Sequence, residues 1–273
     1  IKANLAAAGI NTADYGDIID AVADVRGTLL IDPARVSFGT LSKLPADTAI
    51  VRAMNPSTLL KAIKSDADIE HIREAMRQDG AALCEFFSEF EAELAKGEKL
   101  TELDVDRMLN EARSRQPHHI SPSFGTIAGY KGNGAIVHYS ATEDNFATIE
   151  GDGLLLIDSG GQYYNGTTDI TRMASCGIVS DDEKRDVTYV LKAHIGLANA
   201  HFPEGLPSGQ IDVLARIHLW QQGLDYGHGT GHGVGYFMNV HEGPQVISVH
   251  APATAERVLK RGMITTNEPG LYR

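Results

Sequence analysis

The spacing of apolar side chains predicts a long helix in the first half of the chain. Apolar residues recur there at intervals of three, four and seven positions: Ile69, Ile72, Met76, Leu83, Phe87, Phe90 and Leu94. This period places them on one face of an α-helix that ends near Gly97. Ser65 and Asp68 have the spacing of a capping box, so the helix is expected to begin directly after Ser65.

Further capping-box pairs and apolar stripes predict other helices. Thr101 with Asp104, and Ser180 with Glu183, have the spacing of a helix start. The predicted helices cover residues 14–23, 101–112, 180–200 and 208–220. Because the helices that follow Ser65 and Thr101 carry apolar stripes, we expect one face of each of these two to lie in a core.

Short apolar and β-branched runs predict strands between these helices. They cover residues 28–31, 49–52, 124–128, 135–139, 154–157 and 169–174. The run at 154–157 is typical of a fully buried strand. The strand at 169–174 is expected to pair with a neighbour across the turn around Asn165 and Gly166. The order helices, strands, helices, strands predicts an α+β fold.

Pro56 marks a boundary between a small and a large region. Residues 1–55 have the pattern of a small α/β unit, and residues 56–273 hold the long helices and the remaining strands. The sequence predicts two structural units of unequal size.

Composition narrows the class of protein. The chain has 273 residues, 42% of them hydrophobic and 22% charged, as in an ordinary soluble globular protein. No apolar run approaches the roughly 20 residues of a membrane span, and no signal pattern opens the chain, so we expect a cytoplasmic protein without membrane contact. A net charge of −12 without a basic cluster argues against nucleic acid as a partner. With only two cysteines, no disulfide framework is expected, and Cys84, which lies among apolar residues, is expected to be buried.

Four residues in the second half have the chemistry of metal ligands. Asp158 closes an apolar run, Asp169 follows eleven residues later, His232 lies in HGTGHGVG, and Glu268 lies in TTNEPG. An aspartate that ends a strand is usually a turn or cap residue, but glycines around a histidine allow another group to approach closely. Three carboxylates and an imidazole together suit one or two hard divalent ions and indicate a hydrolase.

The same segments carry a family resemblance. IDSGGQYYNGTTDITR, HGTGHGVGYFMNVHEGP and TTNEPG resemble the metal-binding signatures of Xaa-Pro aminopeptidases of the aminopeptidase P type, in the pita-bread metallopeptidase family. The resemblance implies a pita-bread α+β fold over residues 56–273, preceded at residues 1–55 by part of a smaller α/β creatinase-like domain. It also implies two divalent metal ions, commonly manganese with zinc or cobalt as alternatives, a peptide substrate that begins Xaa-Pro, and an assembly that is often a homodimer.

The resemblance assigns a role to each ligand. Asp158 would bind one ion through both oxygens, and Asp169 would bridge the two ions. His232 and Glu268 would hold the second ion. An activated water would attack the carbonyl before proline, and Glu268 is also a catalytic candidate because it could relay a proton.

Three further histidines receive roles from the same resemblance. His138 would be a catalytic or substrate-binding residue, and His228 would line a pocket for the proline ring. His241 would bind the substrate and stabilise the developing oxyanion. Without the motifs, a histidine beside an apolar strand such as His138 is more often a structural residue. Glu242 is interpreted as a structural hydrogen-bond partner.

Several alternatives stay open from the sequence. The family carries a fifth ligand, a bridging glutamate, about a dozen residues beyond the EPG motif, and the chain ends at Arg273. The chain also opens without methionine, so we expect a fragment whose own activity is open. Prolidase, which cleaves Xaa-Pro dipeptides, is the nearest rival. A pita-bread module that binds peptides without cleaving them is the alternative from another class, and metal content would distinguish it.

Overall fold

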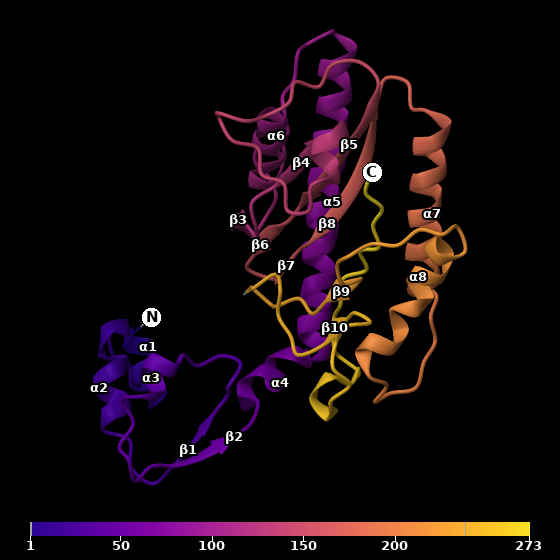
Figure 1. The fold of residues 1–273 in the computed structure, drawn as a ribbon. Helices are drawn as coiled ribbons and strands as arrows, with labels where there is room; N and C mark the ends of the chain where they lie inside the picture. The colour runs from indigo at the N-terminus through magenta and orange to yellow at the C-terminus, as the bar shows by residue number, and fades with distance from the viewer. Residues whose placement is uncertain (1, 238) are drawn as a thin grey trace. The chain divides into compact units, whose positions relative to one another are not determined.

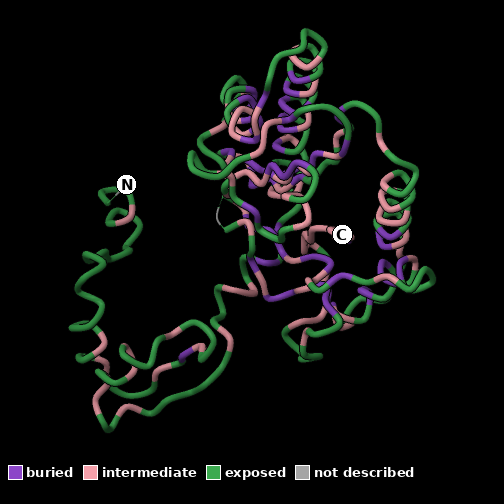
Figure 2. The backbone as a smooth tube through the Cα atoms, turned by 45° about the horizontal axis from the view of Figure 1, so that its top comes forward, coloured by how far each residue is buried: buried purple, intermediate pink, exposed green. Residues whose placement is uncertain are grey.

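The computed structural model describes residues 2–237 and 239–273, and the chain divides into two compact units at residues 58 and 59. The first unit contains α1 (Lys2–Ala7), η1 (Tyr15–Asp17), α2 (Ile18–Ala23), β1 (Thr28–Ile31), α3 (Phe38–Leu41) and β2 (Ala49–Arg52). The predicted strands pair in parallel, β1 with β2. Among the described residues of this unit only Ile31 is buried, so it has little core of its own (Figure 2).

Two helices form the centre of the larger unit. After α4 (Pro56–Ala62), α5 (Asp66–Ala95) begins directly after the Ser65–Asp68 capping box, and α6 (Glu102–Ser114) begins after the Thr101–Asp104 box, as predicted. Gly97, with φ +81°, adopts the left-handed conformation that commonly follows a helix. Cys84 is exposed, so the prediction that it is buried was wrong, because it lies beside the buried stripe of α5.

A three-stranded antiparallel sheet packs on these helices (Figure 1). It consists of β4 (Ile127–Tyr130), β5 (Gly153–Ser159) and β8 (Ile170–Cys176), with β5 in the middle. Side chains of β5 alternate between buried and partly exposed, so the prediction of a fully buried strand was wrong. Leu155 and Ile157 enter the same core as Phe86 and Phe90 of α5, so the partly exposed Asp158 points to the opposite face of β5.

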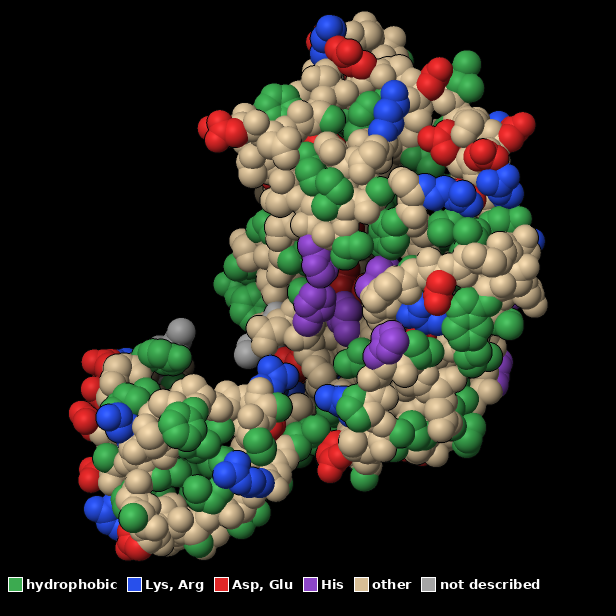
Figure 3. Space-filling model, viewed as in Figure 1, with side chains coloured by type: hydrophobic (Ala, Val, Ile, Leu, Met, Phe, Trp, Pro, Cys, Tyr) green, Lys and Arg blue, Asp and Glu red, His purple; other side chains and the backbone are tan. Residues whose placement is uncertain are grey.

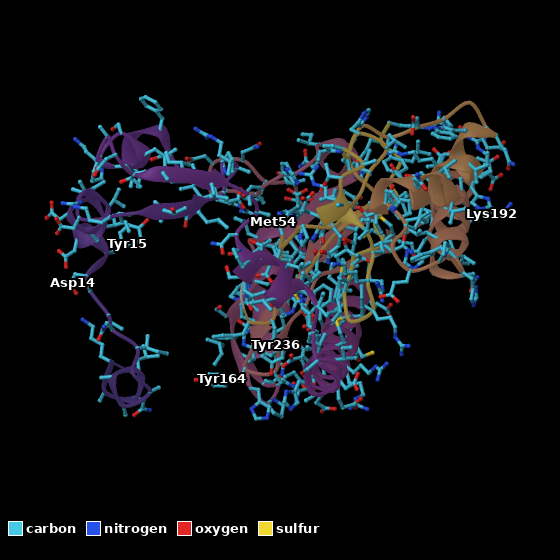
Figure 4. All side chains as sticks on the ribbon, turned by 90° about the horizontal axis from the view of Figure 1, so that it is seen from below. Asp14, Tyr15, Met54, Tyr164, Lys192 and Tyr236 are labelled. Carbon is cyan, nitrogen blue, oxygen red and sulfur yellow. The ribbon has the colours of Figure 1, made fainter. Side chains whose placement is uncertain are left out.

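The remaining elements lie around this sheet. A second sheet contains β3 (His119–Pro122), β6 (Gly161–Tyr163) and β7 (Gly166–Thr167), and β9 (Gly231–His232) pairs with β10 (Val246–Ile247). Helices α7 (Asp181–Ala198) and α8 (Val213–Trp220) lie side by side and share a second core, with Lys192 on the exposed side of α7 (Figures 1 and 4). Three 3-10 turns complete the unit: η2 (Lys131–Ala135), η3 (Ser208–Ile211) and η4 (Ala255–Arg257).

Two strand predictions require correction. The strand at 169–174 exists as β8 but pairs with β5, because the turn at residues 165 and 166 joins β6 to β7 instead. The strand predicted at 124–128 is shifted to β4. Within the described residues, no helix combines the length and the apolar character needed to cross a bilayer.

The strand predicted at 135–139 is absent because a buried carboxylate organises this segment differently. Glu102 of α6 is buried and accepts hydrogen bonds from the backbone N–H of Tyr130 (2.7 Å), from the Tyr139 hydroxyl (2.8 Å) and from the Ala147 N–H (2.7 Å). These bonds draw the segment into a turn, in which His138 has φ +57°. Ile136 and Val137, the apolar residues of this segment, stay largely exposed and therefore have no core to pack against.

Candidate metal centre

Three of the four predicted ligands converge on one point. Asp169 precedes β8, His232 lies in β9, and Glu268 lies in the final segment, yet one ligand atom from each lies within 4.8 Å of the others. His232 Nε2 is 3.1 Å from Glu268 Oε1 and 3.3 Å from Asp169 Oδ2. Figure 3 shows histidine side chains gathered around acidic ones on this face of the larger unit.

Glycines beside His232 allow the backbones to approach each other. The His232 N–H donates to Thr266 Oγ1 (2.9 Å), and the Thr266 N–H donates to the His232 carbonyl (2.9 Å). A Cβ on Gly231 would lie 2.2 Å from the Thr266 carbonyl oxygen, and a Cβ on Gly233 would lie 2.0 Å from that of Glu242. The HGTGHGVG sequence is therefore required by close packing as well as by the ligand.

The hydrogen bonds of His232 suit a metal ligand. Its Nδ1 lies 2.8 Å from the Gly233 carbonyl, which can only accept, so Nδ1 carries a proton and Nε2 is left to coordinate. His232 Nε2 and Glu268 Oε1 are buried, and neither has a hydrogen-bond partner of acceptable geometry among the described residues. Buried polar atoms without partners are unusual and call for a bound ion or water. The donor set therefore fits a divalent cation.

The pKa shifts of His232 and Glu268 also suit a site for a cation. Burial alone would lower the pKa of His232, but the carboxylates of Asp169 and Glu268 raise it to about 10. Burial opposes ionisation of Glu268, yet its interactions with His232 and Thr266 outweigh burial and lower its pKa. Without a cation the cluster therefore holds a proton on the imidazole. A metal ion would take the place of that positive charge.

Asp158 borders the three-residue set but is not part of it. It lies in β5 opposite Thr171 of β8, whose hydroxyl donates to Asp158 Oδ1 (2.8 Å). Burial, and then the charge of Asp169, raise the pKa of Asp158 to about 6. A raised pKa is the expected effect of burial and of a second carboxylate close by. Thr171 was missed by the sequence analysis, although its two-residue spacing from Asp169 gives the same strand face.

Two predicted histidines lie near this cluster. The ring of His241 packs edge-on against His232, with centroids 4.2 Å apart and planes at 89°. Burial, and then the charge of His232, lower the pKa of His241, and His138 contributes to the same shift. His138 is exposed and belongs to a turn, so it is presented by the loop that Glu102 holds and not by a strand end.

His228 is connected to the site through a tyrosine that the sequence analysis missed. Its Nε2 lies 2.8 Å from the Tyr272 hydroxyl, and the two rings meet edge-on at 5.4 Å. Burial raises the pKa of Tyr272, and the charges of Asp158 and Glu268 add to that shift, so its hydroxyl lies near the carboxylates. A Cβ on Gly270 would lie 2.7 Å from the Tyr272 hydroxyl oxygen, so the EPG glycine makes room for this contact.

Comparisons with known proteins show which proteins this chain is similar to. The chain is 39% identical to aminopeptidase P2 of Arabidopsis thaliana over 100% of its length, which is 42% of that relative. A crystal structure of an X-prolyl aminopeptidase from Caenorhabditis elegans, described as a cytosolic enzyme with a di-nuclear active site, superposes with a TM-score of 0.88 at 31% identity, covering 100% of this chain and 45% of that one. An Xaa-Pro dipeptidase from Bacillus anthracis is more distant, with a TM-score of 0.77 at 26% identity over 97% of this chain and 71% of that one.

These matches establish the family and the fold. The chain spans about two fifths of the length of the curated relatives that it matches, such as the Arabidopsis protein at 42%. The predicted α+β pita-bread fold is confirmed by the superposition on the C. elegans structure. The model of metallopeptidase family M24 matches residues 70–273, a stretch that contains Asp158, Asp169, His232 and Glu268. The chain belongs to metallopeptidase family M24.

Proposed function

We propose that the protein is a metal-dependent Xaa-Pro aminopeptidase, which removes the first residue from peptides with proline in second position. The observation that carries this proposal is the convergence of Asp169, His232 and Glu268, with an unpartnered buried imidazole nitrogen at its centre. The names and identities of the relatives support the substrate class.

The ligands are proposed to hold two divalent ions, manganese first among the candidates. Asp158 is assigned to one ion, His232 and Glu268 to the other, and Asp169 to both. The C. elegans enzyme, described as di-nuclear, supports this number. Divalent ions in such a site supply Lewis acidity and lower the pKa of a bound water. The side chains present are oxygen-rich, which favours manganese over softer ions, with zinc and cobalt as the alternatives.

The other residues are assigned to proton transfer and substrate binding. Glu268, one of whose carboxylate oxygens has no partner of acceptable geometry, is the candidate to relay a proton during attack on the peptide carbonyl. His241, held against His232 and with a lowered pKa, is the candidate to donate a hydrogen bond to the developing oxyanion. A neutral imidazole can donate such a bond through its remaining N–H.

Proline specificity is assigned to His228 and His138. A bond before proline has no N–H, so a site that packs the pyrrolidine ring selects it better than one that reads the amide. His228, fixed by Tyr272, and His138, presented by its turn, are the proposed walls of that pocket.

The decisive experiment compares three peptides with the full-length gene product and added Mn²⁺. Release of the first residue from Xaa-Pro-Xaa, with little release from Xaa-Ala-Xaa, supports the proposal. Preference for the dipeptide Xaa-Pro would instead support prolidase, to which the B. anthracis structure is similar. Absence of cleavage and of bound metal would support a non-catalytic peptide-binding module.

The wider organisation is also a proposal. Residues 1–55 are assigned to a creatinase-like N-terminal domain and residues 56–273 to the catalytic domain, which the structural division at residue 58 and the sparse core of the first unit support. A cytoplasmic location is supported by the C. elegans protein, described as cytosolic. A homodimer is the proposed assembly, and the mass of the full-length gene product in solution tests it.

A further inference from the structure

A buried ion pair joins helices α5 and α6. Asp79 of α5 and Arg113 of α6 are both fully buried. Arg113 donates from Nε to Asp79 Oδ1 (2.6 Å) and from Nη2 to Asp79 Oδ2 (3.3 Å). This two-pronged geometry fixes the carboxylate and the guanidinium relative to each other.

The pair is bonded to the residues next to both aspartate ligands. Arg113 Nη2 also donates to Ser159 Oγ (3.0 Å), and Ser159 directly follows Asp158. Thr168, whose hydroxyl donates to Asp79 Oδ2 (2.6 Å), directly precedes Asp169. One buried pair is therefore bonded to the immediate neighbours of both predicted ligands.

The bonds to Ser159 and Thr168 restrict the positions of the neighbouring ligands, Asp158 and Asp169. Successive side chains of a strand point to opposite faces, so a residue held in the core directs its neighbour outward. In β5 the alternation places Ser159 on the buried face, with Asp158 on the opposite one. Thr168 and Asp169 lie between β7 and β8, where the buried Thr168 restrains the backbone directly before the partly buried Asp169. Anchoring Ser159 in the core thereby directs Asp158 to the opposite face of β5, and anchoring Thr168 restrains the position of Asp169.

A contribution to folding stability does not by itself explain why this ion pair is buried here. Replacing a buried ion pair by packed apolar residues is often neutral or stabilising, so such a pair is weak evidence for a role in stability. Asp79 additionally accepts from the Tyr163 hydroxyl (2.9 Å), whereas the buried Nη1 of Arg113 has no partner among the described residues. For comparison, an exposed ion pair joins Glu85 of α5 to Arg115, which directly follows α6.

We propose that Asp79 and Arg113 are positioning residues of the metal centre, which act through Thr168 and Ser159 on the orientation of Asp169 and Asp158. The inference rests on the proposed function, because it presupposes that the two aspartates bind metal. Loss of a partner that orients a ligand typically weakens metal binding by about 10-fold to 100-fold. Loss of the Thr168 hydroxyl should therefore weaken binding without removing any ligand.

The test uses adjacent threonines with different partners. Thr168→Val removes the bond to Asp79 and also the bond that Thr168 Oγ1 accepts from the Gly161 N–H (2.8 Å), so Arg113→Met is needed to test the ion pair by itself. Thr167→Val removes a bond from the neighbouring buried threonine to Gln162 (2.7 Å) and leaves the ion pair intact. Thr168→Ser keeps the hydroxyl and serves as the rescue. A second comparison sets Arg113→Met against the exposed Arg115→Met. Calorimetric titration of each metal-free full-length variant with Mn²⁺ gives Kd and stoichiometry, and thermal unfolding checks that each is folded.

The expected result is an increase in the Mn²⁺ Kd of about 10-fold or more for Thr168→Val, and values within about threefold of the unsubstituted protein for Thr168→Ser and Thr167→Val. Equal Kd values for Thr168→Val and the unsubstituted protein, or an equal loss in Thr167→Val, would overturn the positioning role. Because Thr168→Val changes only one hydroxyl, the comparison of the threonine variants stands even where Arg113→Met does not fold. Failure of the unsubstituted protein to bind Mn²⁺ would instead refute the proposed function, together with the inference that rests on it.

Discussion

Gly231→Ala should disrupt the metal centre without touching a ligand. A Cβ at this position would lie 2.2 Å from the Thr266 carbonyl oxygen, and real Cβ contacts essentially never fall below 3.0 Å. The difference requires the two backbones to separate by about 0.8 Å. Because the obstructing atom belongs to the backbone, no side-chain rotation can relieve the contact.

This separation of the backbones would also move the ligands His232 and Glu268 apart. His232 follows Gly231, and Glu268 lies two residues beyond Thr266, so separation of these segments lengthens the 3.1 Å contact between His232 Nε2 and Glu268 Oε1. Overpacking of this kind typically costs about 1–3 kcal/mol in the free energy of unfolding. A misplacement of about 1 Å can also cost about 100-fold in turnover. We expect weaker Mn²⁺ binding and turnover reduced by about 100-fold, with moderate loss of stability.

Gly227→Ala is the matched control. Gly227 precedes the same segment, and a Cβ there would meet no atom within 4 Å. Mn²⁺ titration, thermal unfolding and hydrolysis of an Xaa-Pro-Xaa peptide should separate the two variants of the full-length gene product. Metal affinity and turnover in Gly231→Ala within twofold of the Gly227→Ala values would refute the reasoning.

Three further predictions concern the chemistry of the site. Without metal, the pKa of His232 is about 10 and that of Asp158 about 6, so between pH 7 and 8 the imidazole is protonated and the carboxylate is ionised. Mn²⁺ binding must therefore displace one proton from the imidazole, and the Mn²⁺ affinity should rise about tenfold per pH unit between pH 7 and 8. Titrations at both pH values, and in buffers of different ionisation enthalpy, measure that proton, and a pH-independent Kd would contradict the prediction. His241→Ala should lower turnover by about 100-fold to 1,000-fold while metal content is retained, and loss of metal would make His241 a ligand instead. His228→Ala should reduce the ratio of kcat/KM for Xaa-Pro-Xaa over Xaa-Ala-Xaa while metal affinity is unchanged, and an unaltered ratio would exclude His228 from the proline pocket.

The helices were predictable because their signals are local. The capping boxes at Ser65, Thr101 and Ser180 all form as predicted, since each needs only residues three positions apart. Strand partners were less predictable. Pairing depends on which distant segment lies alongside, and β8 pairs with β5 although a turn closer in sequence suggested another neighbour.

The candidate ligands were predictable from residue type and glycine context, whereas their supports were not. Asp79 and Glu102 lie in helices whose stripes predicted only a core, yet both are buried carboxylates that hold site segments in place. A single acidic residue in a helix carries no sequence signal that distinguishes it from a solvated one. Burial with partners from other elements exists only after folding, and a buried charge is tolerated only where such partners meet it.

The sequence by itself determined where the helices begin, which residue types could bind a metal, and which family the motifs resemble, because capping, periodicity and ligand chemistry act over short distances. Only the tertiary structure decided that Asp169, His232 and Glu268 meet within 4.8 Å, that Asp158 borders this set, and that Tyr272 fixes His228. Contacts between residues so far apart in the sequence depend on how sheets and loops pack around a common core, and that packing is a property of the whole chain and not of any segment.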